Sequence, residues 1–195
     1  MKAEGKNELV LGEGVWRVEK GDLDRYGYFL LDKSTKISGQ GRGLTTVVGV
    51  GLAIKGNKSD GIVEIQDLTI KGGEGCGLYA YEGMDVIMRG CTIEECGENG
   101  VDAEGADITC DDLQVIGCSN SGVYAYNNAT ITLSGHGTSI QGNGTKGDRN
   151  DYGLKARSSS SSIHLVPPLT KEQISKNNRG GRNWGGEGTI KQISK

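Results

Sequence analysis

Four segments of this chain share one pattern, in which a glycine precedes an aliphatic residue, a variable residue and an alanine: Gly77-Leu78-Tyr79-Ala80, Gly100-Val101-Asp102-Ala103, Gly122-Val123-Tyr124-Ala125 and Gly153-Leu154-Lys155-Ala156. The four glycines are 23, 22 and 31 residues apart. A period of about 20 to 50 residues indicates a supersecondary unit stacked on copies of itself, because a single copy cannot bury its own apolar face. We therefore expect a repeat protein.

Within each repeat, apolar residues alternate with polar ones in short runs that Gly, Asn and Asp interrupt. This period of two is typical of half-buried strands and differs from the 3.6-residue period of helices. Three such runs fit into one repeat, and equivalent runs of successive repeats must pair in parallel. The sequence thus predicts an all-β parallel β-helix of about 22–23 residues per coil, with about six or seven coils.

The composition agrees with many turns and a slim core, since 195 residues include 34 glycines, two prolines and one phenylalanine. We expect a single domain, 1–195, with opening coils over 1–50, regular coils over 51–166, and a C-terminal cap and last strand over 167–195. Thr170-Lys171-Glu172-Gln173 has the pattern of a capping box, so a short helical turn is expected there.

Charge and hydropathy exclude two classes of partner. The net charge is −3, and no basic stripe with interleaved aromatics indicates nucleic acid. No apolar run reaches the roughly 18 residues that a membrane span needs. The first residues lack the apolar stretch of a signal peptide, so a cytoplasmic protein is expected.

The cysteines are five in number and mostly occupy inward positions: Cys76, Cys91, Cys96, Cys110 and Cys118. Cys96 and Cys118 fall at equivalent places on successive coils and should stack. We interpret them as reduced thiols that act as small hydrophobes, with a disulfide between them as the alternative. The spacings match no zinc pattern, so neither a metal site nor a cofactor is expected.

Both ends of the chain resemble known proteins. Lys36-Ile37-Ser38-Gly39-Gln40-Gly41 and Thr45-Thr46-Val47-Val48-Gly49 are similar to the opening of right-handed parallel β-helix proteins of the pectin lyase-like superfamily. The stretch from Ile163-His164-Leu165 to Gly188-Thr189-Ile190 resembles small uncharacterised β-helix proteins of algae, protists and their large viruses. The superfamily includes lyases, polygalacturonases, epimerases, phage tailspikes and plain binding helices, so the resemblance implies a fold and no single activity.

Polygalacturonase motifs are only partly matched. Asp111-Asp112, Gly135-His136-Gly137 and Lys155-Ala156-Arg157 are similar to three of the four motifs of that family, and the fourth is missing. The first two lie at the corner after the second strand of a coil and the third lies on a first strand, so one face cannot easily hold all of them. Arg89, Asp112 and His136 could form a catalytic column at that corner, with a surface salt-bridge ladder as the alternative.

A stronger functional signal lies on the first strand of each coil. If the Gly-led aliphatic residues and alanines point inward, the residues between them project outward as a ladder: Tyr79, Tyr81, Asp102, Glu104, Tyr124, Tyr126, Lys155 and Arg157. Tyrosine rings pack against the C–H faces of sugars while charged groups bond their hydroxyls. The two tyrosine pairs are two coils apart, roughly 9.5 Å. The alternative is an ordinary sheet stabilised by cross-coil pairs.

These patterns favour a non-catalytic binding or structural module that presents this ladder to a polysaccharide or a protein surface. One alternative is a polysaccharide-active enzyme (a uronate lyase, an epimerase or a glycoside hydrolase), in which a tyrosine and Lys155 or Arg157 handle proton abstraction and neutralise a uronate carboxylate. A third is a component of a virion or larger assembly. Oligomeric state and ligand identity do not follow from the sequence.

Overall fold

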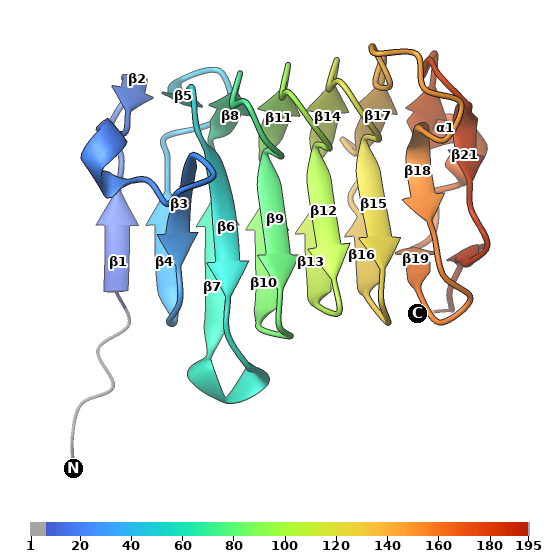
Figure 1. Ribbon diagram of the computed structural model, residues 1–195, viewed down its shortest axis with the longest axis horizontal. Helices are drawn as coiled ribbons and strands as arrows, with labels where there is room; N and C mark the ends of the chain where they lie inside the picture. Colours follow the sequence, from blue (N-terminus) through green and yellow to red (C-terminus); the bar gives the residue numbers. More distant parts are fainter. Residues whose placement is uncertain (1–6, 195) are drawn as a thin grey trace.

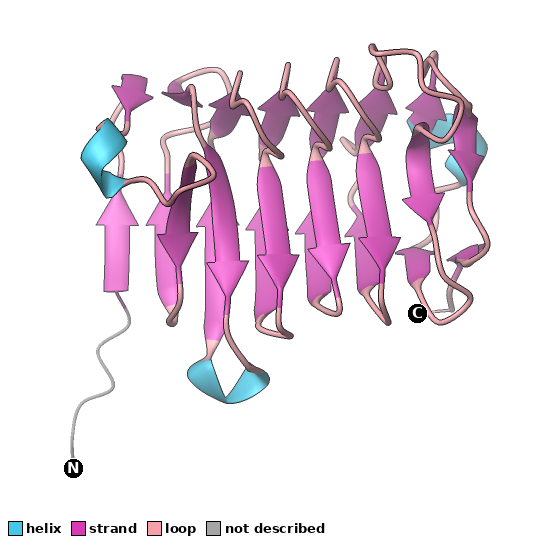
Figure 2. Cartoon of the chain, in the orientation of Figure 1, coloured by secondary structure: helices cyan, strands magenta, loops and turns pink. Residues whose placement is uncertain are grey.

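A computed structural model, which describes residues 7–194, shows a right-handed parallel β-helix (Figure 1). Each coil contributes one strand to each of three sheets, and neighbouring strands are parallel. The largest sheet has eight strands, so the helix has about eight coils instead of the six or seven expected. The difference arises because short strands at both ends continue the sheets beyond the regular repeats. Figure 2 shows that strands dominate the regular structure.

Sheet A consists of β1 (Asn7–Val10), β4 (Thr35–Ser38), β7 (Ile62–Gln66), β10 (Asp85–Arg89), β13 (Asp107–Asp111), β16 (Thr130–Ser134), β19 (Ser162–Leu165) and β22 (Thr189–Gln192). Sheet B consists of β2 (Gly14–Arg17), β5 (Thr45–Val48), β8 (Thr69–Lys71), β11 (Thr92–Glu94), β14 (Gln114–Ile116), β17 (Ser139–Gln141) and β20 (Ser175–Lys176). Sheet C, in front in Figure 1, consists of β3 (Tyr28–Leu31), β6 (Gly51–Lys55), β9 (Leu78–Tyr81), β12 (Val101–Glu104), β15 (Val123–Tyr126), β18 (Tyr152–Ala156) and β21 (Arg182–Gly185). The helical segments are η1 (Lys20–Asp22), η2 (Lys58–Asp60) and α1 (Lys171–Ile174).

The inward register of sheet C is confirmed. Ala103 pairs with Ala80 on one neighbouring coil and with Ala125 on the other. All three alanines, and the aliphatic residues two positions before them, are fully buried in the core. Identical or similar side chains therefore stack along the axis, and each coil covers the apolar face of the next.

In the regular coils, four corners between sheets A and B each contain one left-handed residue directly after the strand of sheet A. Asp67, Gly90, Asp112 and Gly135 follow β7, β10, β13 and β16, with φ angles of 56°, 59°, 51° and 85°. Glycine adopts this conformation freely, and Asp and Asn tolerate it better than other residues. Corner geometry thus explains Asp112, while Asp111 is the last residue of β13.

The C-terminal cap contains the expected helical turn. Thr170 is the N-cap of α1, and its Oγ1 accepts a hydrogen bond of 3.3 Å from the backbone N–H of Gln173. Strands β20, β21 and β22 then add one further strand to each sheet. All five cysteines are buried and unpaired, and Cys96 and Cys118 lie inside the core.

Candidate functional site

The expected ladder forms on the outward face of sheet C. Strand pairing places Asp102 between Tyr79 and Tyr124, and Glu104 between Tyr81 and Tyr126. Lys155 follows Tyr124 on the next coil. We call the eight residues Tyr79, Tyr81, Asp102, Glu104, Tyr124, Tyr126, Lys155 and Arg157 the sheet C ladder.

The tyrosines of the ladder form one connected patch. Tyr79 stacks on Tyr81 with ring centroids 4.9 Å apart, and Tyr124 stacks on Tyr126 at 4.8 Å. The hydroxyls of Tyr79 and Tyr126 both donate to Oε2 of Glu104, at 2.5 and 2.8 Å. These bonds lower the pKa of Glu104, and burial raises the pKa values of both tyrosines. The pairs thus converge on one carboxylate instead of standing as separate platforms about 9.5 Å apart.

Two ladder residues are less accessible than the alternation predicted. Tyr124 is only 9% exposed, because Tyr126 stacks on its ring, the Lys155 ammonium lies 4.8 Å from the ring centroid, and Arg157 donates to its hydroxyl at 3.3 Å. Asp102 is 6% exposed, between its two tyrosine neighbours. An outward-pointing side chain in a stacked ladder is covered by the coils on either side of it.

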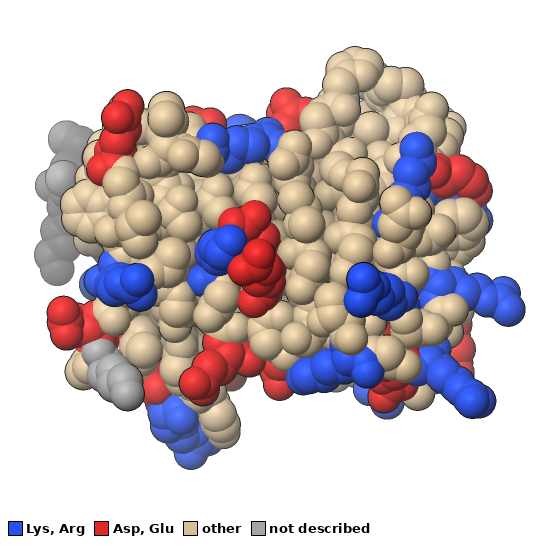
Figure 3. Space-filling model, turned by 90° about the horizontal axis from the view of Figure 1, so that it is seen from above, with Lys and Arg blue, Asp and Glu red and all other residues tan. Residues whose placement is uncertain are grey.

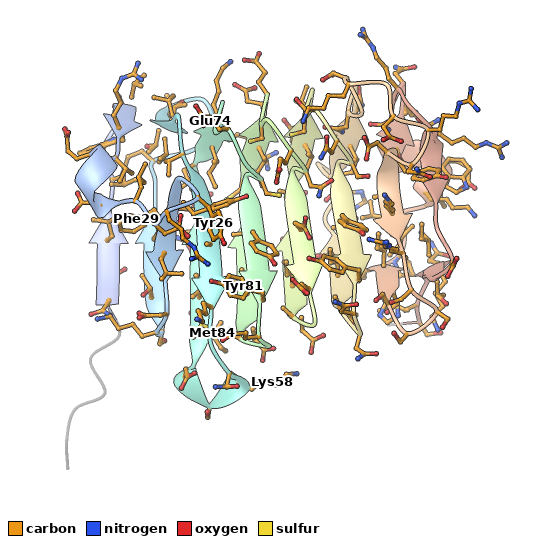
Figure 4. The ribbon with its side chains drawn as sticks, in the orientation of Figure 1. Tyr26, Phe29, Lys58, Glu74, Tyr81 and Met84 are labelled. Carbon is orange, nitrogen blue, oxygen red and sulfur yellow. The ribbon has the colours of Figure 1, made fainter. Side chains whose placement is uncertain are left out.

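A groove of about 670 Å³ opens over the N-terminal half of the ladder. Its floor includes Ala53, Tyr79 and Asp102, and its walls come from the loop before β3 and from the turn before β9. Figure 4 shows Tyr26 on that loop and Tyr81 on β9, both on the front face of the molecule.

Tyr28 connects the two walls of the groove by a hydrogen bond. Its hydroxyl accepts a hydrogen bond of 2.7 Å from the backbone N–H of Cys76. A Cβ at Gly75 would collide with that same hydroxyl, so only glycine allows this close approach. Burial raises the pKa values of both Tyr28 and Cys76, which keeps them protonated at neutral pH.

Asp102 is the most unusual group in the groove. Its Oδ2 accepts a 2.7 Å hydrogen bond from Nδ2 of Asn99 and a 3.6 Å contact from the Cys76 thiol. Its Oδ1 is buried and accepts no hydrogen bond from the residues that the structure describes. Burial raises the pKa of Asp102 to about 7. A carboxyl group with this pKa can hold or release a proton near neutral pH.

The C-terminal half of the ladder is basic. Burial lowers the pKa of Lys155, which lies beside the exposed Arg157. A second hollow of about 500 Å³, lined by Arg149, Arg182 and Trp184 among others, lies at this end. Figure 3, which views the molecule from above, shows several Lys and Arg side chains at the C-terminal end and others over the rest of this side. Along sheet C, the outward carboxylates Asp102 and Glu104 are thus followed, two coils further on, by Lys155 and Arg157.

The proposed catalytic column does not form. Arg89 pairs in register with Asp111, not with Asp112, and its guanidinium lies 3.4 Å from Glu64. Oδ1 of Asp112 accepts a hydrogen bond from the backbone N–H of Gly137, as expected for a corner residue. His136 is exposed in the following corner. The predicted column was wrong because Asp112 is equivalent to Gly135 on the next coil. His136 therefore lies one residue beyond the position that would stack on Asp112.

A family model described as a right-handed beta helix region matches residues 50–181. The chain belongs to this right-handed beta helix family. A search among curated proteins and a search among solved structures found no match. The family assignment agrees with the observed coils and names no activity.

Within this β-helix protein, residues 7–194 contain no group of three or more His, Cys, Asp or Glu side chains placed to hold a metal ion. None of the helices in that part of the chain is long and apolar enough to cross a membrane.

The repeat pattern did not predict the residues that form the walls of the groove. Cys76 and Asn99 occupy equivalent positions one coil apart, just before the Gly-led strands, and a closer alignment of the repeats would have placed both beside Asp102. The loop that carries Tyr26 precedes the regular repeats, so no periodic signal could position it over sheet C.

Proposed function

We propose that this protein is a non-catalytic carbohydrate-binding module that holds its ligand in the groove over sheet C. The observation that carries the proposal is the continuous tyrosine patch, joined through Glu104, that opens into the groove of about 670 Å³. Small-molecule sites typically measure about 300–1,000 Å³, so the groove suits a few sugar units.

The chemistry of the groove supports a sugar over a purely apolar ligand. Tyr26 and Tyr81 offer aromatic faces for the C–H side of a pyranose ring, and both line the groove. Carboxylates at Asp24 and Glu98 lie at the same site and can accept hydrogen bonds from sugar hydroxyls. The resemblance to the pectin lyase-like superfamily, many of whose members act on polysaccharides, is in keeping with this ligand class.

A glycan array run beside a lyase assay tests the proposal. We expect selective retention of one class of oligosaccharide and recovery of that sugar uncleaved. Binding should weaken when the tyrosine faces are removed. An array on which no glycan is retained would contradict carbohydrate binding and would favour a structural or assembly role.

Two contacts of Tyr124 favour a second function, a polysaccharide lyase or epimerase at the basic half of the ladder. The Tyr124 hydroxyl accepts a hydrogen bond from Arg157 at 3.3 Å, and Lys155, whose pKa is lowered by burial, lies over the same ring. A tyrosine beside two cations is a reasonable base for a proton next to a carboxylate. Unsaturated products that disappear in Tyr124→Phe would support this function.

A further inference from the structure

The groove over sheet C contains more carboxylates than cations. Four carboxylates line it: Asp24, Glu74, Glu98 and Asp102. Figure 4 shows Glu74 at the upper edge of sheet C. None of the four forms an ion pair within the part of the chain that the structure describes.

The two cations of the groove are already engaged. The ammonium of Lys55 lies 3.6 Å from the carboxylate of Glu82, which is not a groove residue. The guanidinium of Arg25 lies 4.7 Å from the centroid of the Tyr26 ring. Neither contact neutralises Asp102 or Glu98.

Asp102 and Glu98 converge on a neutral group. The Cys76 thiol lies 3.6 Å from Oδ2 of Asp102 and 3.7 Å from Oε2 of Glu98. One thiol proton can serve only one carboxylate at a time, and a thiol is a weak donor. Oδ1 of Asp102, buried and without a partner among the described residues, adds a second unmet acceptor. The carboxylates of Asp102 and Glu98 lack a positively charged hydrogen-bond donor. An ammonium group provides three N–H donors and a full positive charge.

The aromatic residues of the groove suit the same group. Tyr28 and Tyr79 are tilted by 45° with centroids 6.3 Å apart, and Tyr81 stacks on Tyr79. Ring faces attract cations through their quadrupole, most strongly where water is excluded.

Building on the carbohydrate-binding function above, we propose that the groove recognises an amino sugar, whose free ammonium group lies above Asp102 and Glu98. A neutral sugar would leave the carboxylates uncompensated. A uronate would add a further carboxylate next to them.

Titration calorimetry with a soluble glucosamine oligomer and with its N-acetylated counterpart of equal length tests this inference. We expect the glucosamine oligomer to bind at least about tenfold more tightly, as for one charged hydrogen bond. Asp102→Asn should remove that preference, and Glu98→Gln should reduce it. Glu13→Gln, which removes an exposed negative charge outside the groove, should leave it unchanged and so controls for general attraction of a polycation.

The outcomes separate the two proposals. Equal or tighter binding of the acetylated or of an acidic oligomer would overturn the amino-sugar inference and leave carbohydrate binding intact. A preference that survives in both Asp102→Asn and Glu98→Gln would also overturn it. Failure of every oligosaccharide to bind would overturn both proposals. A melting curve for each variant confirms that it folds, and Glu98→Gln, at an exposed position, provides the test if Asp102→Asn does not.

Discussion

Replacing Asp102 by asparagine should make the protein more stable, and increasingly so as the pH rises. The folded protein holds this carboxyl in a buried site with one oxygen lacking a partner, so ionisation is costly there. In the unfolded chain, water solvates the charge. Asparagine has nearly the shape of the protonated acid and never ionises.

The magnitude follows from the pKa. Burial raises the pKa of Asp102 from 3.8 to about 7. One pKa unit corresponds to about 1.4 kcal/mol, so the full effect is about 4 kcal/mol. Below about pH 4 the group is protonated in both states and contributes no difference. Between about pH 4 and 7 only the unfolded chain releases the proton, so the native protein loses stability through this group, and above about pH 7 the loss is constant.

Urea denaturation of the native protein and of Asp102→Asn across this pH range measures the effect. We expect similar free energies of unfolding near pH 4 and a variant more stable by up to about 4 kcal/mol near pH 8. Glu98→Gln is the matched control, because its carboxylate is exposed, and its difference from the native protein should stay below about 1 kcal/mol throughout. A difference between native protein and Asp102→Asn that does not grow with pH would refute the reasoning.

Three further variants or treatments test the fold and the ladder. Ala125→Asp places a charge in the core and should cost about 3–5 kcal/mol, and an unchanged melting temperature would disprove the inward register. Cys96 and Cys118 are buried, so a thiol reagent should label them only after denaturation; fast labelling of the native protein would contradict this. Tyr79→Phe removes the hydroxyl that donates to Glu104 and should cost about 1 kcal/mol in urea denaturation, whereas an unchanged midpoint would show that this bond adds no stability.

The repeat made the core predictable. Strict alternation around Ala80, Ala103 and Ala125 leaves one register in which the slim residues face inward, and a slip by one residue would bury charges. The outward ladder followed from the same alternation. The solvent accessibility of the ladder could not be predicted in this way. The burial of Tyr124 depends on the positions of the long side chains of Lys155 and Arg157, which come from the adjacent coil.

The groove depends on features that do not repeat. The loop with Asp24 and Tyr26 lies before the regular coils and is oriented by a local turn, in which Oδ1 of Asp24 accepts hydrogen bonds from the backbone N–H groups of Tyr26 and Tyr28. The raised pKa of Asp102 likewise arises from its burial beside Cys76 and Asn99. The position of the Asp24 loop leaves no periodic trace in a single sequence, whereas the places of Cys76 and Asn99 follow from the repeat and only the burial of Asp102 between them does not.

The carbohydrate-binding function is tested most directly by titrating the best-retained oligosaccharide into the native protein and into the double variant Tyr26→Ala/Tyr81→Ala. Both rings line the groove, and each should contribute about 1 kcal/mol of stacking, so we expect binding to weaken by about 30-fold. Ile116→Ala, which removes an exposed apolar side chain from sheet B, should leave the affinity unchanged. Equal affinity in the native protein and the double variant, with both folded, would contradict the placement of the ligand in this groove.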